Sequence, residues 1–227
     1  MDDSQIEAAL AAAEESLAAG SSLSGTGFWA AVGALKRQPS LVARFGDRIA
    51  AIDQAAFANW ALVKVSMGVG TSLMVAGTAA GLALIWWAYY LTGLSASIVF
   101  LLGTGALMVT THGLAHLVVG QLVGIRFTAW FIGSWLQPQP GVKVDYETYL
   151  ATPPARRAWM HASGAITTKL LPFVLIGAAA ASGAQGWVTV ALLVIGVVAI
   201  VTDVLWSANA SDWSRFRREM GFAQGSV

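Results

Sequence analysis

The sequence predicts an all-α integral membrane protein with four transmembrane helices, a cytoplasmic helical N-terminal region, and a short cytoplasmic hairpin or re-entrant segment. Two observations on composition and charge support this fold class. Of the 227 residues, 56% are hydrophobic and 11% are charged, against roughly 25% charged in an ordinary soluble domain. Between Lys64 and Arg126 lie 61 consecutive residues without Asp, Glu, Lys or Arg. Such long apolar runs are typical of membrane helices and lack the short alternating strands of a membrane barrel.

The composition also excludes several classes of function. Thirteen Lys and Arg nearly balance twelve Asp and Glu, so we expect the lipid bilayer, and no nucleic acid, as a partner. Cysteine is absent, which excludes disulfides, thiolate metal sites and cysteine nucleophiles.

Residues 1–62 are predicted to form a helical region at the cytoplasmic surface of the membrane. Apolar residues recur at helical spacing near the start, at Ile6, Leu10, Ala13 and Leu17. A Ser- and Gly-rich linker at 20–27 precedes a second helical stretch at 28–60, which Pro39 should interrupt. The acidic start differs from the basic start of a signal peptide, so we expect this region to stay in the mature chain.

Residues 63–207 are predicted to form the four-helix transmembrane core, with residues 208–227 as a cytoplasmic tail. Each span needs about 20 apolar residues, and the sequence offers four such stretches, at about 66–91, 97–123, 158–181 and 187–206. Gly93-Leu94-Ser95 breaks the first long run, and Ser182 to Gly186 breaks the second.

The positions of Lys and Arg predict the orientation. Basic residues precede the first span, lie between the second and third, and follow the fourth, whereas both hairpin tips have none. Because basic residues collect on the cytoplasmic side, we expect a multi-pass protein of the cell membrane with both termini in the cytoplasm.

The middle connection, 126–157, carries apolar and polar residues in alternation at Val142 to Tyr146, beside proline and glycine. This pattern is typical of a short hairpin. A loop that covers the cytoplasmic end of the bundle is the alternative.

Four ionisable residues lie deep in the predicted spans: His112, His116, Lys169 and Asp203. A charge at this depth is costly unless it is paired, ligated or hydrated, so each is a candidate functional residue. His112 and His116 are four residues apart and therefore project from one helix face, where they could share a zinc ion. Histidines that only pack and hydrogen-bond between helices are the alternative.

The depth of Asp203 makes it the expected third metal ligand. His112 and His116 come 15 and 19 residues after Ser97, and Asp203 comes 16 residues after Trp187. Spans two and four run in the same direction, so these three residues should share one layer of the membrane. The alternative is an ion pair between Asp203 and Lys169, which would hold helices together without chemistry.

The order of these motifs resembles the site-2 protease family of intramembrane zinc metalloproteases. His112-Gly113-Leu114-Ala115-His116 stands at the place of the family's His-Glu-x-x-His motif, and Gly164 to Thr168 at the place of its Gly-Pro-x-x-Asn element. Asp203 stands where the family has Asp-Gly. The resemblance covers about residues 66–207. It implies one zinc ion held by His112, His116 and Asp203, with the polar residues Thr168 and Lys169 nearby.

One departure from the family bears directly on activity. Gly113 replaces the glutamate that acts as general base in the family, and loss of such a group costs on the order of 10²–10⁴-fold in rate. Asp145 or Glu147 could provide a substitute base. We therefore expect weak or no peptidase activity, that is, a pseudoprotease that binds a transmembrane helix of a substrate or partner protein.

Two other functions are compatible with the same residues. The protein could be a structural or cofactor-holding subunit of a larger membrane complex, with His112 or His116 as an axial ligand of haem or a chlorin. It could also be a transporter that uses Lys169 and Asp203, which would call for a homodimer because four spans enclose little space.

Overall fold

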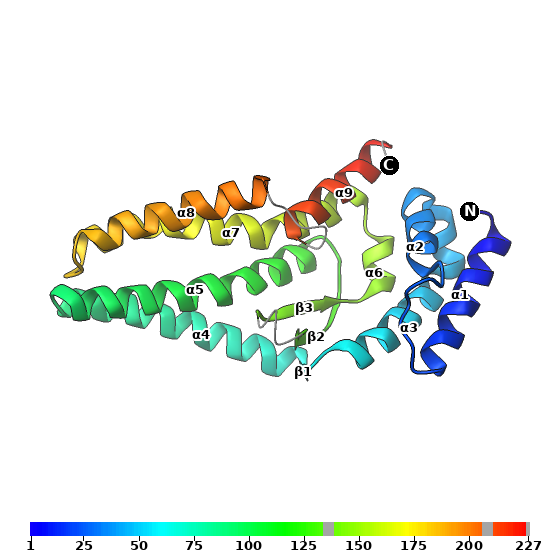
Figure 1. The fold of residues 1–227 in the computed structure, drawn as a ribbon, viewed down its shortest axis with the longest axis horizontal. Helices are drawn as coiled ribbons and strands as arrows, with labels where there is room; N and C mark the ends of the chain where they lie inside the picture. Colours follow the sequence, from blue (N-terminus) through cyan, green and yellow to red (C-terminus); the bar gives the residue numbers. More distant parts are fainter. Residues whose placement is uncertain (134–138, 206–210, 226–227) are drawn as a thin grey trace.

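The computed structural model describes residues 1–133, 139–205 and 211–225, without the side chain of residue 204. The protein is predominantly helical and elongated, with a bundle of long helices at one end and short helices with a small sheet at the other (Figure 1). In chain order the elements are α1 (Asp3–Ala18), α2 (Phe28–Arg37), η1 (Pro39–Leu41), α3 (Val42–Trp60), β1 (Val63–Val65), α4 (Met67–Trp87), η2 (Ala88–Tyr90), α5 (Gly93–Leu122), β2 (Phe127–Ile132), β3 (Gly141–Val144), α6 (Tyr146–Ala151), α7 (Pro154–Ala181), α8 (Trp187–Leu205) and α9 (Asp212–Gln224).

Three of the described helices are long and apolar enough to cross a membrane: Met67–Tyr90, Gly93–Leu122 and Pro154–Ala181. These correspond to the first three predicted spans, and they indicate a membrane protein. The helix at the fourth predicted span, α8, has a shorter apolar stretch, Trp187–Asp203. Residue 206, the predicted end of that span, lies outside the described residues.

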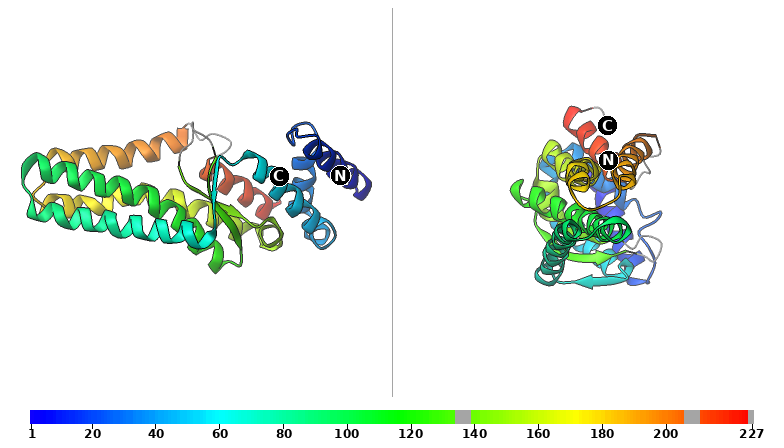
Figure 2. Two further views of the ribbon diagram at one scale, coloured as in Figure 1. Left: turned by 90° about the horizontal axis from the view of Figure 1, so that it is seen from below. Right: turned by 90° about the vertical axis from the view of Figure 1, so that its left-hand side faces the viewer.

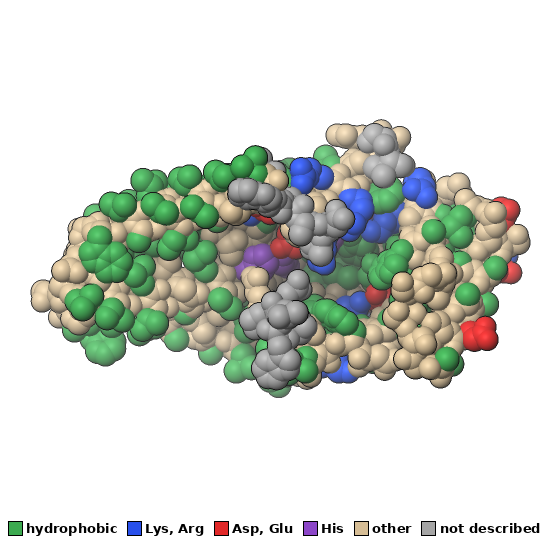
Figure 3. Space-filling view, viewed as in Figure 1, with side chains coloured by type: hydrophobic (Ala, Val, Ile, Leu, Met, Phe, Trp, Pro, Cys, Tyr) green, Lys and Arg blue, Asp and Glu red, His purple; other side chains and the backbone are tan. Residues whose placement is uncertain are grey.

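The surface of the bundle has the apolar character that lipid requires. Large hydrophobic side chains are exposed along all four long helices, among them Leu73, Leu82, Leu102, Val118, Val174, Val190 and Val197. Figure 3 shows hydrophobic side chains distributed over this end of the molecule. A soluble protein of this size seldom exposes so much contiguous apolar surface, so the bundle surface supports a membrane environment.

The two hairpin tips are joined at the far end of the bundle. The backbone N–H of Gly93 donates to the carbonyl of Gly183 over 2.9 Å. The N–H of Gln185 donates to Ser97 Oγ over 2.9 Å. Helix α5 therefore begins at Gly93, four residues before the predicted start of the second span.

The N-terminal helices form a unit with a hydrophobic core of its own, which continues into the end of the bundle. Helix α1 begins with a capping box between Asp2 and Gln5, and Pro39 separates α2 from α3 as predicted. The core contains apolar side chains from α1, α2 and α3, together with Ile125, Tyr149, Leu150 and Met160 of the membrane core. The N-terminal unit is thus docked on the end of the molecule that carries the sheet (Figure 2).

The prediction of an all-α fold needs one correction, because the structure contains a three-stranded sheet in the order β1-β2-β3. Strands β2 and β3 form an antiparallel pair, which agrees with the hairpin expected in the middle connection. Strand β1 is the unexpected member. It pairs with β2, with Val63 opposite Ile132 and Val65 opposite Trp130. Only three residues form β1, too short a run for the alternation in the sequence to be recognised.

The predicted cytoplasmic tail contains a further helix, α9, that packs against α7. Ser211 caps its N-terminus by accepting a hydrogen bond from the N–H of Ser214 over 3.1 Å. The sequence of α9 is largely polar, so the sequence pattern did not predict that one face of this helix is buried. That face brings Asp212 and Glu219 back to the bundle.

Candidate metal centre

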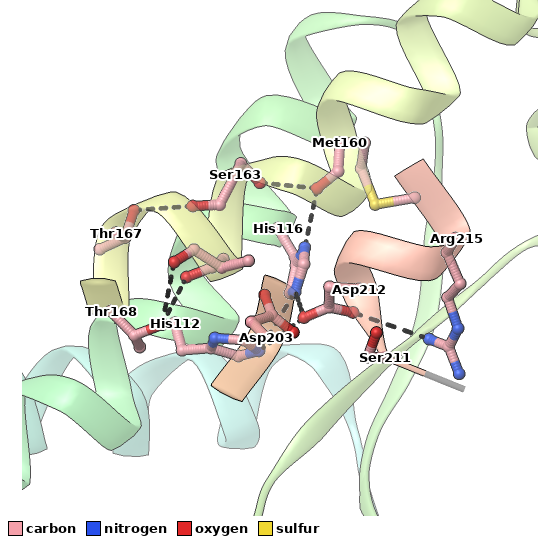
Figure 4. A network of polar contacts seen from close by, with 12 residues as sticks. His112, His116, Met160, Ser163, Thr167, Thr168, Asp203, Ser211, Asp212 and Arg215 are labelled. Carbon is pink, nitrogen blue, oxygen red and sulfur yellow. Dashed lines mark hydrogen bonds and ion pairs between the residues drawn. The ribbon is translucent and has the colours of Figure 1, made fainter. Parts of the chain in front are cut away.

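Two imidazoles and one carboxylate converge where the bundle meets the sheet and α9. His112 and His116 lie one turn apart on α5, as their spacing predicts, and Asp212 comes from the first turn of α9 (Figure 4). His116 Nε2 lies 3.3 Å from His112 Nε2 and 3.1 Å from Asp212 Oδ2. His112 Nε2 lies 3.2 Å from the same carboxylate oxygen.

These separations fit a divalent metal ion. Zinc binds imidazole nitrogen and carboxylate oxygen at about 2.0–2.2 Å in tetrahedral geometry, which sets the distance between two ligand atoms at about 3.3–3.5 Å. The three ligand atoms of this cluster lie close to that distance from one another. Among the residues that the structure describes, this is the group of His and acidic side chains able to hold a metal.

The orientation of His116 prepares it to bind a cation. Its Nδ1 lies 2.8 Å from the carbonyl oxygen of Met160 on α7. Because a carbonyl only accepts hydrogen bonds, Nδ1 carries a proton, and in the neutral ring Nε2 then presents a lone pair to the cluster. A backbone partner of this kind is the usual support of a metal-binding histidine.

His112 lacks such a support. Its Nδ1 is buried without a hydrogen-bond partner among the described residues. The ring is held by its edge-to-face contact with His116, with centroids 4.8 Å apart. His116 is therefore the better oriented of the two imidazoles.

Gly164 of α7 provides the space that His116 occupies. A Cβ atom at this position would lie 2.3 Å from His116 Nε2, far inside van der Waals contact. Only glycine allows α7 to approach the ring this closely, so Gly164 shapes the candidate metal centre.

The carboxylate of Asp212 is ionised in this setting. Burial by itself raises the pKa of Asp212, but hydrogen bonds that the protonated imidazoles of His112 and His116 donate to it, together with their positive charge, lower the pKa by more. The result is a pKa well below the usual range of a carboxyl group. A metal ion takes the place of these imidazole protons when it binds. Asp212 therefore offers the charged oxygen that a metal ligand needs.

A buried cluster of charged side chains anchors α9 two turns beyond Asp212. The carboxylate of Glu219 accepts a hydrogen bond from Arg157 Nε over 2.8 Å and one from Tyr149 Oη over 3.0 Å, and it pairs with Lys36 of α2. Burial raises the pKa of Glu219, but Lys36 and Arg157 lower it by more, so the carboxyl group stays ionised. Asp212 and Glu219 are seven residues apart and lie on one face of α9.

Among the described residues, the group able to hold a metal contains Asp212 and not Asp203, the expected third ligand. Asp203 Oδ2 lies 2.6 Å from Lys169 Nζ, which is the alternative that the sequence left open. Residues at the same depth on two helices face each other only if both helices are rotated that way. Helix α8 packs against α7, which carries Lys169. Thr168 donates its hydroxyl hydrogen bond to its own helix, to the carbonyl of Gly164 over 3.1 Å.

The space beside Gly113 is filled by an aromatic ring. A Cβ atom at Gly113 would lie 2.5 Å from Cζ3 of Trp130, a buried side chain of β2 that donates from Nε1 to Thr71 Oγ1 over 3.1 Å. The substitute bases considered from sequence lie elsewhere. Asp145 and Glu147 both pair with Arg126, each over 3.0 Å.

An open cavity of about 620 Å³ adjoins the metal centre on the side of the sheet and the N-terminal helices. His112, His116 and Asp212 are part of its lining. Figure 3 shows the histidines in this hollow, with basic side chains around it. The centre is thus accessible to a ligand rather than closed inside the bundle.

Sequence reasoning identified both histidines but missed Asp212. The acid comes directly after Ser211 at the start of an amphipathic stretch, which signals a helix N-terminus but not a ligand. No protein-family model matches the sequence, and neither a curated protein nor a solved structure matches it.

Proposed function

We propose that this protein is a zinc-binding integral membrane protein with a site-2-protease-like layout, and that it binds a transmembrane helix of a partner with weak or no peptidase activity. The observation that carries the proposal is the convergence of His112, His116 and Asp212 within 3.3 Å of one another. Two neutral imidazoles and one carboxylate form a ligand set that zinc favours, with a fourth position left open.

Gly113 and Trp130 are the residues that favour a binding role over catalysis. Zinc polarises a carbonyl that reaches it, but peptide hydrolysis also needs a group that takes and returns protons. A glutamate at position 113 would meet the ring of Trp130. The space that a glutamate side chain would need at position 113 is therefore occupied by the packed ring of Trp130.

The proposed topology has four spans, with α8 as the fourth and both termini in the cytoplasm. Helix α8 packs against α7 through Val188 and Leu192 and through the Asp203–Lys169 ion pair. An ion pair at this depth is stable when both partners face a neighbouring helix. The N-terminal unit and α9 lie at the same end of the bundle (Figure 1), together with the basic residues outside the spans.

Metal analysis of the detergent-purified protein tests the zinc proposal. We expect about one zinc ion per chain in the native protein. Asp212→Asn, which keeps the shape of the side chain, should lower the zinc affinity by more than the roughly 10–100-fold that loss of a supporting partner costs. His116→Ala should do the same.

Asp203→Asn is the matched control, because Asp203 pairs with Lys169, and its zinc content should equal that of the native protein. Equal traces of zinc in all four proteins would refute the metal site. Cleavage of a model transmembrane peptide by the zinc-loaded native protein, lost in Asp212→Asn, would refute the binding role.

A further inference from the structure

The cavity beside the metal centre has an imbalance of charge. Its lining includes four basic and two acidic side chains: Lys36, Lys143, Arg215, Arg218, Asp53 and Asp212. Lys143 pairs with Asp53, and Lys36 pairs with the buried Glu219. Two of the four basic groups are therefore already neutralised by acids of the protein.

Arg215 and Arg218 of α9 are not neutralised in this way. Arg215 Nη1 lies 3.9 Å from Asp212 Oδ1, beyond hydrogen-bond distance, and in the proposed function that carboxylate is engaged by zinc. Arg218 has no acidic partner within 4.0 Å among the residues that the structure describes. With the metal bound, this side of the cavity carries an excess of positive charge.

The two arginines lie at a fixed offset from the metal centre. They follow Asp212 at three and six residues along α9, which corresponds to about 4.5 and 9 Å along the helix. Opposite them the cavity has apolar walls from the sheet and α3, including Phe57, Phe127, Phe131 and Val142. A ligand that fits both surfaces has a charged group and an apolar body.

We propose that Arg215 and Arg218 bind the anionic group of an apolar ligand, a carboxylate on a hydrocarbon chain, inside the cavity next to the metal centre. This inference rests on the proposed function, since a bound zinc ion offsets the negative charge of Asp212. A guanidinium forms paired, charge-assisted hydrogen bonds with a carboxylate. A cleft lined by one sign of charge also concentrates ligands of the opposite sign.

Arg217 is the control residue for this proposal, because Lys and Arg also collect on the cytoplasmic side of membrane proteins without binding a ligand. It is exposed on the same helix but is not part of the cavity lining. If the arginines of α9 only set the orientation of the protein in the membrane, Arg217 and Arg218 have the same role. A ligand site gives a role to Arg218 and none to Arg217.

Calorimetric titration of the zinc-loaded protein in nanodiscs of uncharged phosphatidylcholine tests the site, with hexanoate, hexanol and acetate as probes. We expect hexanoate to bind more tightly than either of the other two. Arg218→Gln should weaken hexanoate binding on the order of tenfold, the size of one charged hydrogen bond, and Arg217→Gln should leave it unchanged. Arg218→Lys should retain part of the affinity.

Equal hexanoate binding by Arg218→Gln and Arg217→Gln would overturn the proposal, as would equal binding of hexanol. Zinc content is measured in every sample. Protein with one zinc ion per chain and no arginine-dependent binding refutes the anion site alone, whereas protein without zinc refutes the proposed function.

Discussion

Gly164 shows how a single missing side chain shapes the candidate metal centre. The main constraint on the ring of His116 comes from α7, where the carbonyl of Met160 fixes Nδ1 and the bare backbone of Gly164 leaves room for Nε2. A methyl group at position 164 would overlap the ligand atom itself. The two contacts act together, since a ring pushed away from α7 also loses its hydrogen bond.

We therefore expect Gly164→Ala to displace His116 and to lower zinc affinity by at least tenfold, with a loss of stability of about 1–3 kcal/mol from overpacking. Competition with a chelator of known affinity measures the first effect, and thermal unfolding measures the second. Gly177→Ala is the control, because it lies on the same helix with no atom within 4 Å of its added methyl group. If both variants hold zinc like the native protein, the ring does not depend on Gly164.

At the scale of elements, the position of Asp212 depends on how α9 is docked. Its first turn supplies the ligand, and its third turn buries Glu219 among Arg157, Tyr149 and Lys36. Lys36 belongs to α2, so the N-terminal unit holds the same helix that completes the metal centre. A change at this anchor should reach the metal through a shift of α9.

Glu219→Gln should weaken zinc binding by roughly 10–100-fold, the range for loss of a supporting partner, although Glu219 does not touch the metal cluster. It should also cost roughly 3–5 kcal/mol of stability, since it leaves buried cations unpaired. Chelator competition measures the first quantity, after circular dichroism has shown that the variant is folded. Glu147→Gln, an exposed acid paired with Arg126, should change neither quantity.

At the scale of the whole molecule, the bundle and the docked N-terminal unit both line the cavity beside the metal centre. Exposed apolar side chains cover the bundle. Apart from Lys169, the basic residues lie at the end of the bundle next to the sheet, or beyond that end. This separation predicts the sidedness of the protein, because lipid accepts the first surface and anionic headgroups attract the second.

The absence of cysteine allows a direct test of sidedness with single-cysteine variants. In intact cells, a membrane-impermeant maleimide should label Gly186→Cys at the hairpin tip and should not label Ser21→Cys in the N-terminal linker until the membrane is opened. Both positions are exposed. Labelling of Ser21→Cys but not Gly186→Cys in intact cells would invert the proposed topology.

The sequence by itself determined the features that depend on local pattern. Three of the four predicted spans correspond, within a few residues, to helices that are long and apolar enough to cross a membrane. Pro39 predicted the break in the N-terminal region, and the spacing of His112 and His116 predicted their shared face. Each of these follows from residues close together in the chain, where helical periodicity and backbone chemistry act directly.

The tertiary structure alone decided which acid meets the histidines and which side chain fills the space beside Gly113. Asp203 lies at a suitable depth, but α8 turns it toward Lys169, while α9 brings in Asp212 from 96 residues beyond His116. Trp130 reaches Gly113 from a strand of the sheet. Such contacts depend on how helices are rotated and docked, which is decided by packing between distant segments and leaves no local pattern in the sequence.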